Sequence, residues 1–536
     1  MCIHDEAKIP IYKHFLPSHN RNEPMTWEGT NIKMYKKFKW LTVLIAAVLV
    51  VMTGCQAVGG LDINKAMLTS LDVKSSESSA SIRFEVVPAD KALSSEDKEA
   101  IDLINSLSLN IDHAIVEDSN TVSMQGSVHY SDKKIPLHLS MDAKGMAIQL
   151  DGAKQPFYLS MDTTVPGMPD TSQYEQAIQD VVKKAAGLVL KHFPNPSKVS
   201  VKPVQEKVNG ESLNLTHLQM ELTGEEILNM IKPFAESLLK DEAGLKQVIG
   251  DAYDAIYPMI TSIGEAYGED VELLPQESKE EVVASLYEIV HGALTEFTEN
   301  YDEQKEQLLE ELPGSETVFG KDTVLKLDYY FDEKLNTRKN ALELTVALPA
   351  SEDLPLKAFK VYSKGEVWNI GGAVKANKVD TSKGVLDVLN ESVTPGQVLR
   401  NFEKDSLIYN VLKDDLKITQ KSMFLSPASD DYGYGVIKKN NQSFVPLRYL
   451  ADQLDAEVKW SKGSKRIIVI NDLTGEEIVV TVGSKKASVG GKNVTLAESP
   501  FVHSNGSTYV PLRFMAEALG ATLHLEGDGW ISVERD

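Results

Sequence analysis

Residue types that carry catalysis and metal binding occur throughout this chain, but their spacing forms no recognised reaction centre. Eight histidines follow Cys55, and no two lie within four residues of each other, so no local metal clamp is visible. His291 lacks the H-E-x-x-H spacing of a zinc protease, and no G-x-S-x-G nucleophile elbow is present. Residues 314–322 resemble a phosphate loop, but their glycine spacing is one residue too long and Asp322 replaces the magnesium-binding hydroxyl. These patterns argue against an enzyme and against a metal or other cofactor.

Acidic side chains dominate the charge of the chain. There are 78 Asp and Glu residues against 55 Lys and Arg residues, so the formal net charge is −23. Residues 1–54 carry a net +3 and residues 432–536 a net of zero, which leaves −26 on residues 55–431. Nucleic-acid binding needs a basic footprint, so a nucleic-acid partner is not expected. Carboxylate pairs at this density are most often a solvated face and do not indicate glycosidase chemistry.

A duplicated segment near the C-terminus is the most informative pattern in the sequence. Residues 445–456 and 510–521 match at seven of twelve positions, at an offset of 65 residues. The motif opens with Val445, Pro446, Leu447 and Arg448 in the first copy and with Val510, Pro511, Leu512 and Arg513 in the second. A repeat of this size predicts one module built from two similar units.

Each copy predicts a short amphipathic helix. Pro446 and Pro511 suit the first helical position, where a missing N–H costs nothing. The apolar positions that share one helical face are Leu447, Leu450, Ala451 and Leu454 in the first copy and Leu512, Met515, Ala516 and Leu519 in the second. Gly520 suits a left-handed C-terminal cap, and Asp455 tolerates the same conformation in the first copy.

The repeated arginines favour a structural role over ligand binding. Arg448 and Arg513 fall in the first helical turn, where the helix dipole disfavours a cation. Asp452 and Glu517 lie four residues further on and are expected to pair with them. Strand hairpins follow the helices at 457–460 with 466–470 and at 522–525 with 530–533, and strands 478–482 and 492–496 lie between the copies.

The paired V-P-L-R-[YF]-x-A-x-x-L-x-A motifs make residues 432–536 similar to the copper amine oxidase N-terminal-like domain, or stalk domain, of bacterial surface proteins. The resemblance implies a small α+β envelope module without oxidase chemistry, because the family domain lies outside the catalytic domain of the oxidases. Asn300-Tyr301-Asp302 is similar to the cofactor-forming tyrosine motif of those enzymes, but Phe297 stands where that motif needs Ser or Thr. The sequence also has no His-x-His pair to hold copper.

A lipoprotein export signal is predicted over residues 34–54. A basic start leads into an apolar run from Leu41 to Met52, which is too short to span a bilayer as a lone helix. The segment Val51-Met52-Thr53-Gly54-Cys55 resembles a bacterial lipobox. The resemblance implies that Cys55 becomes the lipidated N-terminus. An ordinary secretory signal or an uncleaved anchor is the alternative.

The flanks of this signal carry no fold of their own. Residues 1–33 are polar, mixed in charge and without periodicity, so they are interpreted as a gene-model extension ahead of a true start at Met34. Residues 55–80 are predicted to be a flexible tether. The two cysteines are Cys2 and Cys55, so the mature chain has no free thiol and no disulfide.

The body, residues 81–375, is predicted to be an antiparallel sheet interrupted by helices. Strands are expected at 82–87, 109–116, 121–130, 135–141, 146–150, 156–161, 199–208, 213–222, 324–331, 341–348, 357–363 and 366–370. Helices are expected at 94–106, 173–193, 224–239, 245–260 and 279–312, with a capping box at 223–226. Residues 376–431 form the expected linker region to the module.

A long antiparallel sheet interrupted by helices, in a lipoprotein, is similar to the curved half-barrel of LolA-like lipoprotein carriers. The resemblance spans residues 62–375, with local cues at 215–222 running into the Glu225 helix and at 326–333. It implies an apolar groove on the concave face of the sheet, covered by helices. The alternative is a filled core without a cavity.

The sequence therefore predicts an α+β protein that is lipid-anchored through Cys55 on the extracytoplasmic face of a bacterial cell membrane. Its expected role is non-enzymatic binding or scaffolding, with the stalk module in contact with cell-wall polymer or an envelope protein. Two alternatives stay open. One is a LolA-like carrier of a lipid or apolar ligand, and the other is an unrecognised envelope hydrolase that uses scattered carboxylates.

Overall fold

The computed structural model describes residues 59–161, 172–267, 278–312, 314–351, 354–389, 393–426, 435–460, 463–526 and 530–535. The expected signal segment and Cys55 lie outside these residues. Among the helices in the described ranges, none is both long enough and apolar enough to cross a membrane. The described chain combines a large antiparallel sheet with helices and a small C-terminal α+β module, which confirms the predicted α+β class.

The body alternates strands and helices. Its first half contains α3 (Ile63–Leu71), β1 (Ser76–Pro88), α4 (Ser95–Ser106), β2 (Ser108–Val116), β3 (Val122–Tyr130), β4 (Lys133–Asp142), β5 (Gly145–Leu150) and β6 (Phe157–Ser160). Its second half contains η1 (Ser172–Tyr174), α5 (Glu175–His192), β7 (Lys198–Val208), β8 (Glu211–Thr223), α6 (Gly224–Leu239), α7 (Glu242–Tyr267), α8 (Lys279–Glu311), α9 (Ser315–Val318), β9 (Val324–Phe331), β10 (Thr337–Ala347) and β11 (Leu356–Trp368). Most bounds match the prediction, because the period of the apolar residues separates strands from helices.

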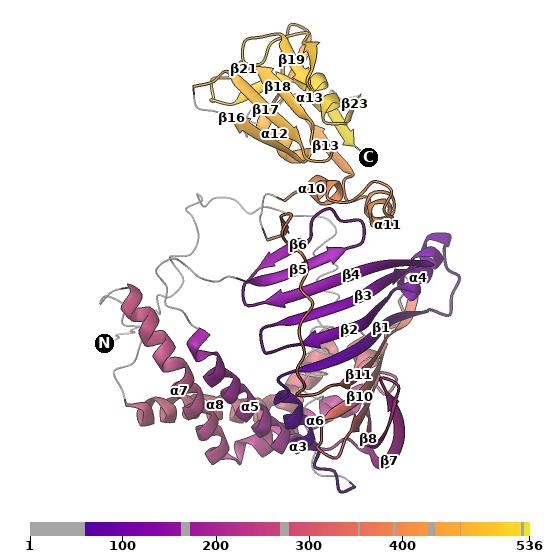
Figure 1. Ribbon diagram of the computed structural model, residues 1–536, viewed down its shortest axis with the longest axis vertical. Helices are drawn as coiled ribbons and strands as arrows, with labels where there is room; N and C mark the ends of the chain where they lie inside the picture. The colour runs from indigo at the N-terminus through magenta and orange to yellow at the C-terminus, as the bar shows by residue number, and fades with distance from the viewer. Residues whose placement is uncertain are drawn as a thin grey trace, which may run out of the picture. The chain divides into compact units, whose positions relative to one another are not determined.

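The strands form one twelve-stranded sheet in the order β12-β6-β5-β4-β3-β2-β1-β11-β10-β9-β8-β7. The first strand, β1, pairs with β11 in the middle of the sheet, so each half of the body contributes one arm. Every neighbouring pair is antiparallel except β12 (Leu386–Asp387), which runs parallel to β6. Figure 1 shows that this sheet curls, and the predicted half-barrel is confirmed.

Helices α5 to α8 lie beside one arm of the sheet, whereas α4 contacts β1 and β3. These four helices pack against one another, and α6 contacts β8; in Figure 1 this helical layer lies beside β7–β11. Ile227 and Met230 on α6 are buried, as an amphipathic stripe requires. Thr223 caps α6 by accepting a hydrogen bond from the Glu226 N–H. The Glu226 carboxylate accepts from the Ser197 N–H instead of completing the expected capping box.

Two segments, one in the expected tether and one in the body, differ from the prediction. Within the expected tether, residues 63–71 form α3 and β1 begins at Ser76, because Asp62 caps the helix by accepting from the Lys65 N–H at 2.9 Å. Strand β11 continues through Gly365, where the sequence predicts a break between two strands. Gly365 stays extended because it pairs with Ala80 on one side and Asn340 on the other.

The expected linker region is partly built onto the sheet. Its first part crosses the polar side of β3 and β4, where the N–H groups of Asn377 and Val379 donate to the hydroxyls of Ser123 and Ser140. These hydrogen bonds measure 2.8 and 3.0 Å. The later elements are β12, α10 (Pro395–Arg400), α11 (Leu407–Asn410) and the π-helical turn η2 (Val411–Asp415).

The C-terminal module consists of three small sheets and two helices. Its elements are β13 (Lys421–Leu425), β14 (Ile437–Lys439), β15 (Gln442–Pro446), α12 (Leu447–Gln453), β16 (Ala456–Trp460), β17 (Arg466–Asn471), β18 (Glu477–Thr481), β19 (Lys486–Val489), β20 (Lys492–Thr495), β21 (Phe501–Val502), β22 (Thr508–Pro511), α13 (Leu512–Ala518), β23 (Thr522–Leu525) and β24 (Ile531–Arg535). The strand orders are β14-β15-β22-β21, β16-β17-β18-β19-β20 and β13-β24-β23.

The two sequence repeats pair with each other through equivalent strands. Strand β15 pairs antiparallel with β22, and Val445 lies opposite Val510, its equivalent in the other copy. In the first repeat β17 pairs with β18, whereas in the second repeat β24 pairs with β13. A strand that precedes the first repeat thus completes the second. The paired strands of the module begin at Lys421, ahead of the predicted start at residue 432.

Candidate functional site

One side of the large sheet is mostly apolar. Residues directly opposite each other in an antiparallel pair point to the same side of a sheet. One row across the strands contains Ala114, Met124, Leu139, Ile148 and Phe157. A second row on the same side, four residues further along β3, contains Leu342, Ile82, Leu109, Val128 and Ile135. Ser363 lies between Leu342 and Ile82 in this row, and Leu344, Val361 and Phe84 continue the same side. We call the apolar residues among these the apolar face.

The apolar face is only partly covered. Met124, Leu139 and Ile148 keep intermediate exposure. Leu218 on β8 and Leu325 on β9, which point to the same side of the sheet on the helical arm, are fully buried. No charged side chain belongs to the rows named above, so this described surface suits hydrocarbon. Covering such a surface releases about 25 cal/mol for each Å² of apolar area removed from water.

The opposite side of the sheet holds polar cross-strand pairs. Lys360 pairs with Glu85 at 3.4 Å, and the Arg83 guanidinium lies 4.1 Å from the centre of the Tyr362 ring. On the other arm, His217 Nε2 lies 2.6 Å from the Asp328 carboxylate. These contacts join neighbouring strands. They are therefore explained by sheet pairing and indicate no catalytic site.

The structure also brings together a serine, a histidine and an aspartate that the sequence does not place near each other. His192 Nδ1 lies 2.9 Å from Ser237 Oγ, and His192 Nε2 lies 2.8 Å from Asp241 Oδ2. Asp241 also accepts from the N–H of Gly244 at 3.0 Å and from Lys191 at 2.6 Å. Asp241 hydrogen-bonds to the start of α7 and to the end of α5. The three residues therefore join helices of the helical layer α5–α8.

Asp241 makes the stability of this helical layer depend on pH. Hydrogen bonds from Lys191, His192 and the Gly244 N–H hold the pKa of the Asp241 carboxyl well below its usual range. A lowered pKa stabilises the folded state above the usual Asp pKa of about 4, and that contribution is lost as the pH falls below it. We expect Asp241→Asn to lower the free energy of unfolding at pH 7 by about 2 kcal/mol.

The measurement is thermal unfolding of the wild type and Asp241→Asn between pH 7 and pH 3. The difference in unfolding temperature between the two proteins should become smaller as the pH falls. Asp254→Asn is the matched control, because Asp254 pairs with Lys279 while 58% exposed and should change stability little. An unchanged gap at low pH would contradict this role for Asp241.

In the C-terminal module, the repeated apolar residues build the core. Val445, Leu447, Val510 and Leu512 are at most 2% exposed and belong to one cluster. Leu450, Ala451, Leu454, Met515, Ala516 and Leu519 are fully buried in the same cluster, which confirms the predicted helix faces. Pro446 and Pro511 end strands β15 and β22 and precede each helix by one residue, rather than opening it as predicted. Their φ angles near −57° suit both a strand end and a helix start.

The repeated arginines lie on the surface. Arg513 pairs with Glu517 at 3.7 Å, as predicted, but the two side chains are 73% and 60% exposed, so the pair contributes little. In the described part of the module no ion pair within 4 Å joins Arg448 to Asp452. The apolar motif residues therefore lie in the core, and the arginines lie on the surface.

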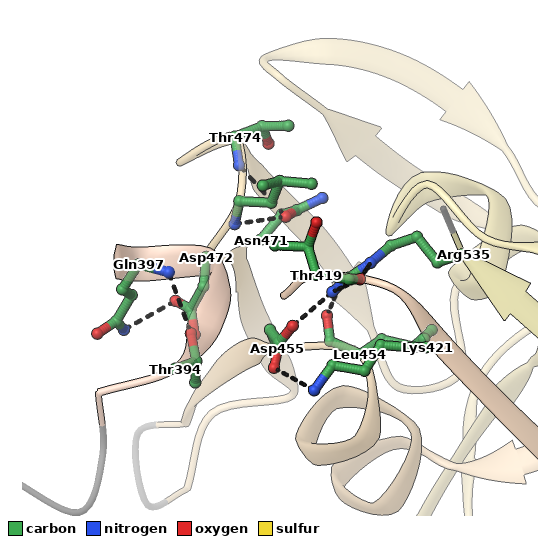
Figure 2. Close-up of polar contacts among 11 residues, drawn as sticks. Thr394, Gln397, Thr419, Lys421, Leu454, Asp455, Asn471, Asp472, Thr474 and Arg535 are labelled. Carbon is green, nitrogen blue, oxygen red and sulfur yellow. Dashed lines mark hydrogen bonds and ion pairs between the residues drawn. The ribbon is translucent and has the colours of Figure 1, made fainter. Parts of the chain in front are cut away.

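A buried ionic cluster holds the two ends of the module together. Asp455 is 3% exposed, and its carboxylate accepts from Arg535 and, at 3.1 Å, from Lys421 (Figure 2). Arg535 also donates to the carbonyl oxygens of Leu454, at 2.6 Å, and Thr419, at 3.1 Å. The cluster thus joins β13, the end of α12 and the last strand of the chain.

Residues 434–532 match the model of the copper amine oxidase N-terminal domain. This match confirms the stalk domain that the paired motifs predict. The copper amine oxidase N-terminal domain is non-catalytic, so the match is compatible with a non-enzymatic protein. It covers the C-terminal module and does not identify the rest of the chain. No curated protein sequence matches the chain.

The sequence predicts the backbone conformation of Asp455 in this domain but not its ionic partner. Its φ of +49° and the +82° of Gly520 confirm the predicted left-handed caps. The ion pair with Arg535 is not predicted, because the two residues are 80 positions apart. A signal is nevertheless present, since a charged residue occupies a position where the other repeat uses glycine.

Proposed function

We propose that this protein is a lipid-anchored, non-enzymatic binding protein of the bacterial envelope that holds an apolar ligand on the apolar face of its half-barrel. The uncharged, partly exposed surface around Met124, Leu139 and Ile148 carries the proposal. The chemical class that fits is the acyl chain of a lipid, because a hydrocarbon chain needs no polar partner. This extends the LolA-like reading of the sequence.

The ligand proposal predicts that one charge on the apolar face abolishes binding. Met124→Glu places a carboxylate against the ligand, and a buried unpaired carboxylate costs several kcal/mol, so we expect lipid affinity to fall at least tenfold. Gln125→Glu is the matched control, because Gln125 is the exposed neighbour on the other side of the same strand. The probe is a phospholipid with a pyrene-labelled acyl chain in phosphatidylcholine vesicles, offered to Cys55→Ser protein. Equal binding by both variants would reject the apolar face as the site.

The anchor has its own test. Cys55 in the lipobox-like segment supports attachment to the extracytoplasmic face of the cell membrane. Mass spectrometry of protein extracted from membranes should find a lipidated N-terminus at Cys55, and Cys55→Ser should move the protein to the soluble fraction. An uncleaved chain beginning at Met34 or Met1 would contradict this assignment.

A second proposed role is contact between the stalk domain and cell-wall polymer or an envelope protein. The observation that favours it is a set of exposed large side chains on the domain, including Trp460 at 61% and Phe424 at 59%. Aromatic rings of this kind stack on sugar rings. We expect Trp460→Ala to reduce co-sedimentation of the Cys55→Ser protein with purified sacculi by more than half. Failure of the parent protein to sediment would rule out wall binding.

A further inference from the structure

The short helix α10 is attached to the stalk domain through a buried carboxylate. Asp472 is 2% exposed and accepts hydrogen bonds from the Thr394 hydroxyl at 2.9 Å and the Gln397 amide at 3.0 Å (Figure 2). Thr394 is also the N-cap of α10, because its hydroxyl accepts from the Gln397 N–H. A Cβ on Gly396 would lie 3.0 Å from the backbone nitrogen of Leu473. The two backbones are therefore closely packed at this contact.

The residues that follow α10 are attached equally firmly to the large sheet. The Asn401 amide donates to the Gln155 carbonyl oxygen at 2.7 Å, and its oxygen accepts from the Gln155 N–H at 3.1 Å. The Lys154 N–H donates to the Asn401 carbonyl oxygen at 2.7 Å. Phe402 is 1% exposed, and its ring centre lies 5.6 Å from that of Phe157. Phe157 belongs to the apolar face, so this attachment reaches the proposed ligand surface.

We propose that residues 394–402, here called the clasp, couple ligand binding on the apolar face to the position of the loop at 471–475 in the stalk domain. This inference rests on the proposed function. A ligand that reaches the β6 end of the apolar face contacts Phe157 and therefore pushes on the Phe402 ring that packs against it. Phe402 is enclosed, and close-packed interiors transmit displacement instead of absorbing it.

The clasp is short enough to move as one piece. Its helix spans six residues, Pro395–Arg400, and is held at one end by Asp472 and at the other by Asn401. A shift at Phe402 therefore changes the geometry at Asp472. Binding free energies are coupled reciprocally, so breaking the Asp472 contact must in turn change lipid affinity, and couplings of this kind are commonly about 5-fold or more.

The test uses the full Cys55→Ser protein with the pyrene-labelled phospholipid as the probe. Hydrogen–deuterium exchange is measured at 394–402 and at 471–475 with and without lipid. The main variant is Asp472→Ala, and Gln397→Ala serves as a milder variant should Asp472→Ala fold poorly. Glu477→Ala is the control, because Glu477 is an exposed carboxylate close by in the same domain.

We expect lipid to change exchange at 471–475 in the wild type and in Glu477→Ala, but not in Asp472→Ala. Lipid affinity should shift at least 3-fold in Asp472→Ala. If the wild type binds lipid while exchange at 471–475 stays constant and Asp472→Ala binds equally well, the coupling is rejected.

Failure of the proposed function gives a different result. If the wild type binds no lipid, the ligand proposal fails, and thermal unfolding decides whether the clasp joins the two parts. One cooperative transition in the wild type that splits into two in Asp472→Ala supports the joint. Two independent transitions already present in the wild type reject it.

Discussion

Asp455→Ala is expected to destabilise the stalk domain by about 3–5 kcal/mol, because it leaves Arg535 buried without its ionic partner. Arg535 is 3% exposed, so water cannot replace the lost carboxylate. Alanine also tolerates the left-handed conformation of Asp455 less well than aspartate does, which adds a smaller cost. The measurement is urea unfolding of the domain, followed by tryptophan fluorescence.

Three further variants separate these causes. Asp455→Gly relieves the backbone strain and still removes the charge, so it should recover only the smaller part of the loss. Asp455→Gly with Arg535→Met removes both charges and should be more stable than Asp455→Gly alone. Asp452→Asn, at an exposed position on α12, is the control and should change stability by less than about 0.5 kcal/mol. Equal stability of Asp455→Ala and the wild type would show that the cluster contributes little.

Removal of β13 is expected to have the other large effect. A fragment of residues 430–536 contains both sequence repeats but leaves the edge of β24 unpaired, and it takes Thr419 and Lys421 away from the ionic cluster. Leu425 is 3% exposed in the domain core, so its loss also opens an apolar surface. We expect this fragment to melt without cooperativity or to aggregate through the exposed strand edge.

A fragment of residues 418–536 is the matched comparison. It restores β13 and both partners of the cluster, and it should unfold in one cooperative transition by circular dichroism. If residues 430–536 fold with the same midpoint, the matched family segment is sufficient and β13 is an accessory strand. That outcome would also show that the second repeat does not need β13 to fold.

The sequence predicts the local structure well where the pattern of apolar residues has one clear period. The alternating strands of the body and the helix faces around Leu450 and Met515 follow directly from that pattern. The glycine break expected in β11 fails, because pairing with β1 and β10 outweighs the turn preference of Gly365. The turn preference of a residue determines its local structure only where pairing with neighbouring strands does not.

The candidate sites are less predictable, because they depend on contacts between distant residues. The duplicated motif predicts the stalk domain, and the family match confirms it. The apolar residues of the motif lie in the core and its arginines lie on the surface. The pairs that hold the structure together, such as Asp455 with Arg535 and Asp472 with Thr394, join residues about 80 positions apart.

By itself, the sequence determined the α+β class, the two-unit C-terminal module and the acidic body, because these features depend on composition and on short-range periodicity. The anchor at Cys55 stays a prediction. Only the tertiary structure decided which side of the sheet is mostly apolar, which strand completes the second repeat and what the clasp contacts. The physical reason is that strand register and buried ion pairs are set by neighbours brought together in space. The sequence of a single strand shows which residues point to the same side of the sheet. Only the neighbouring elements decide which of the two sides becomes buried.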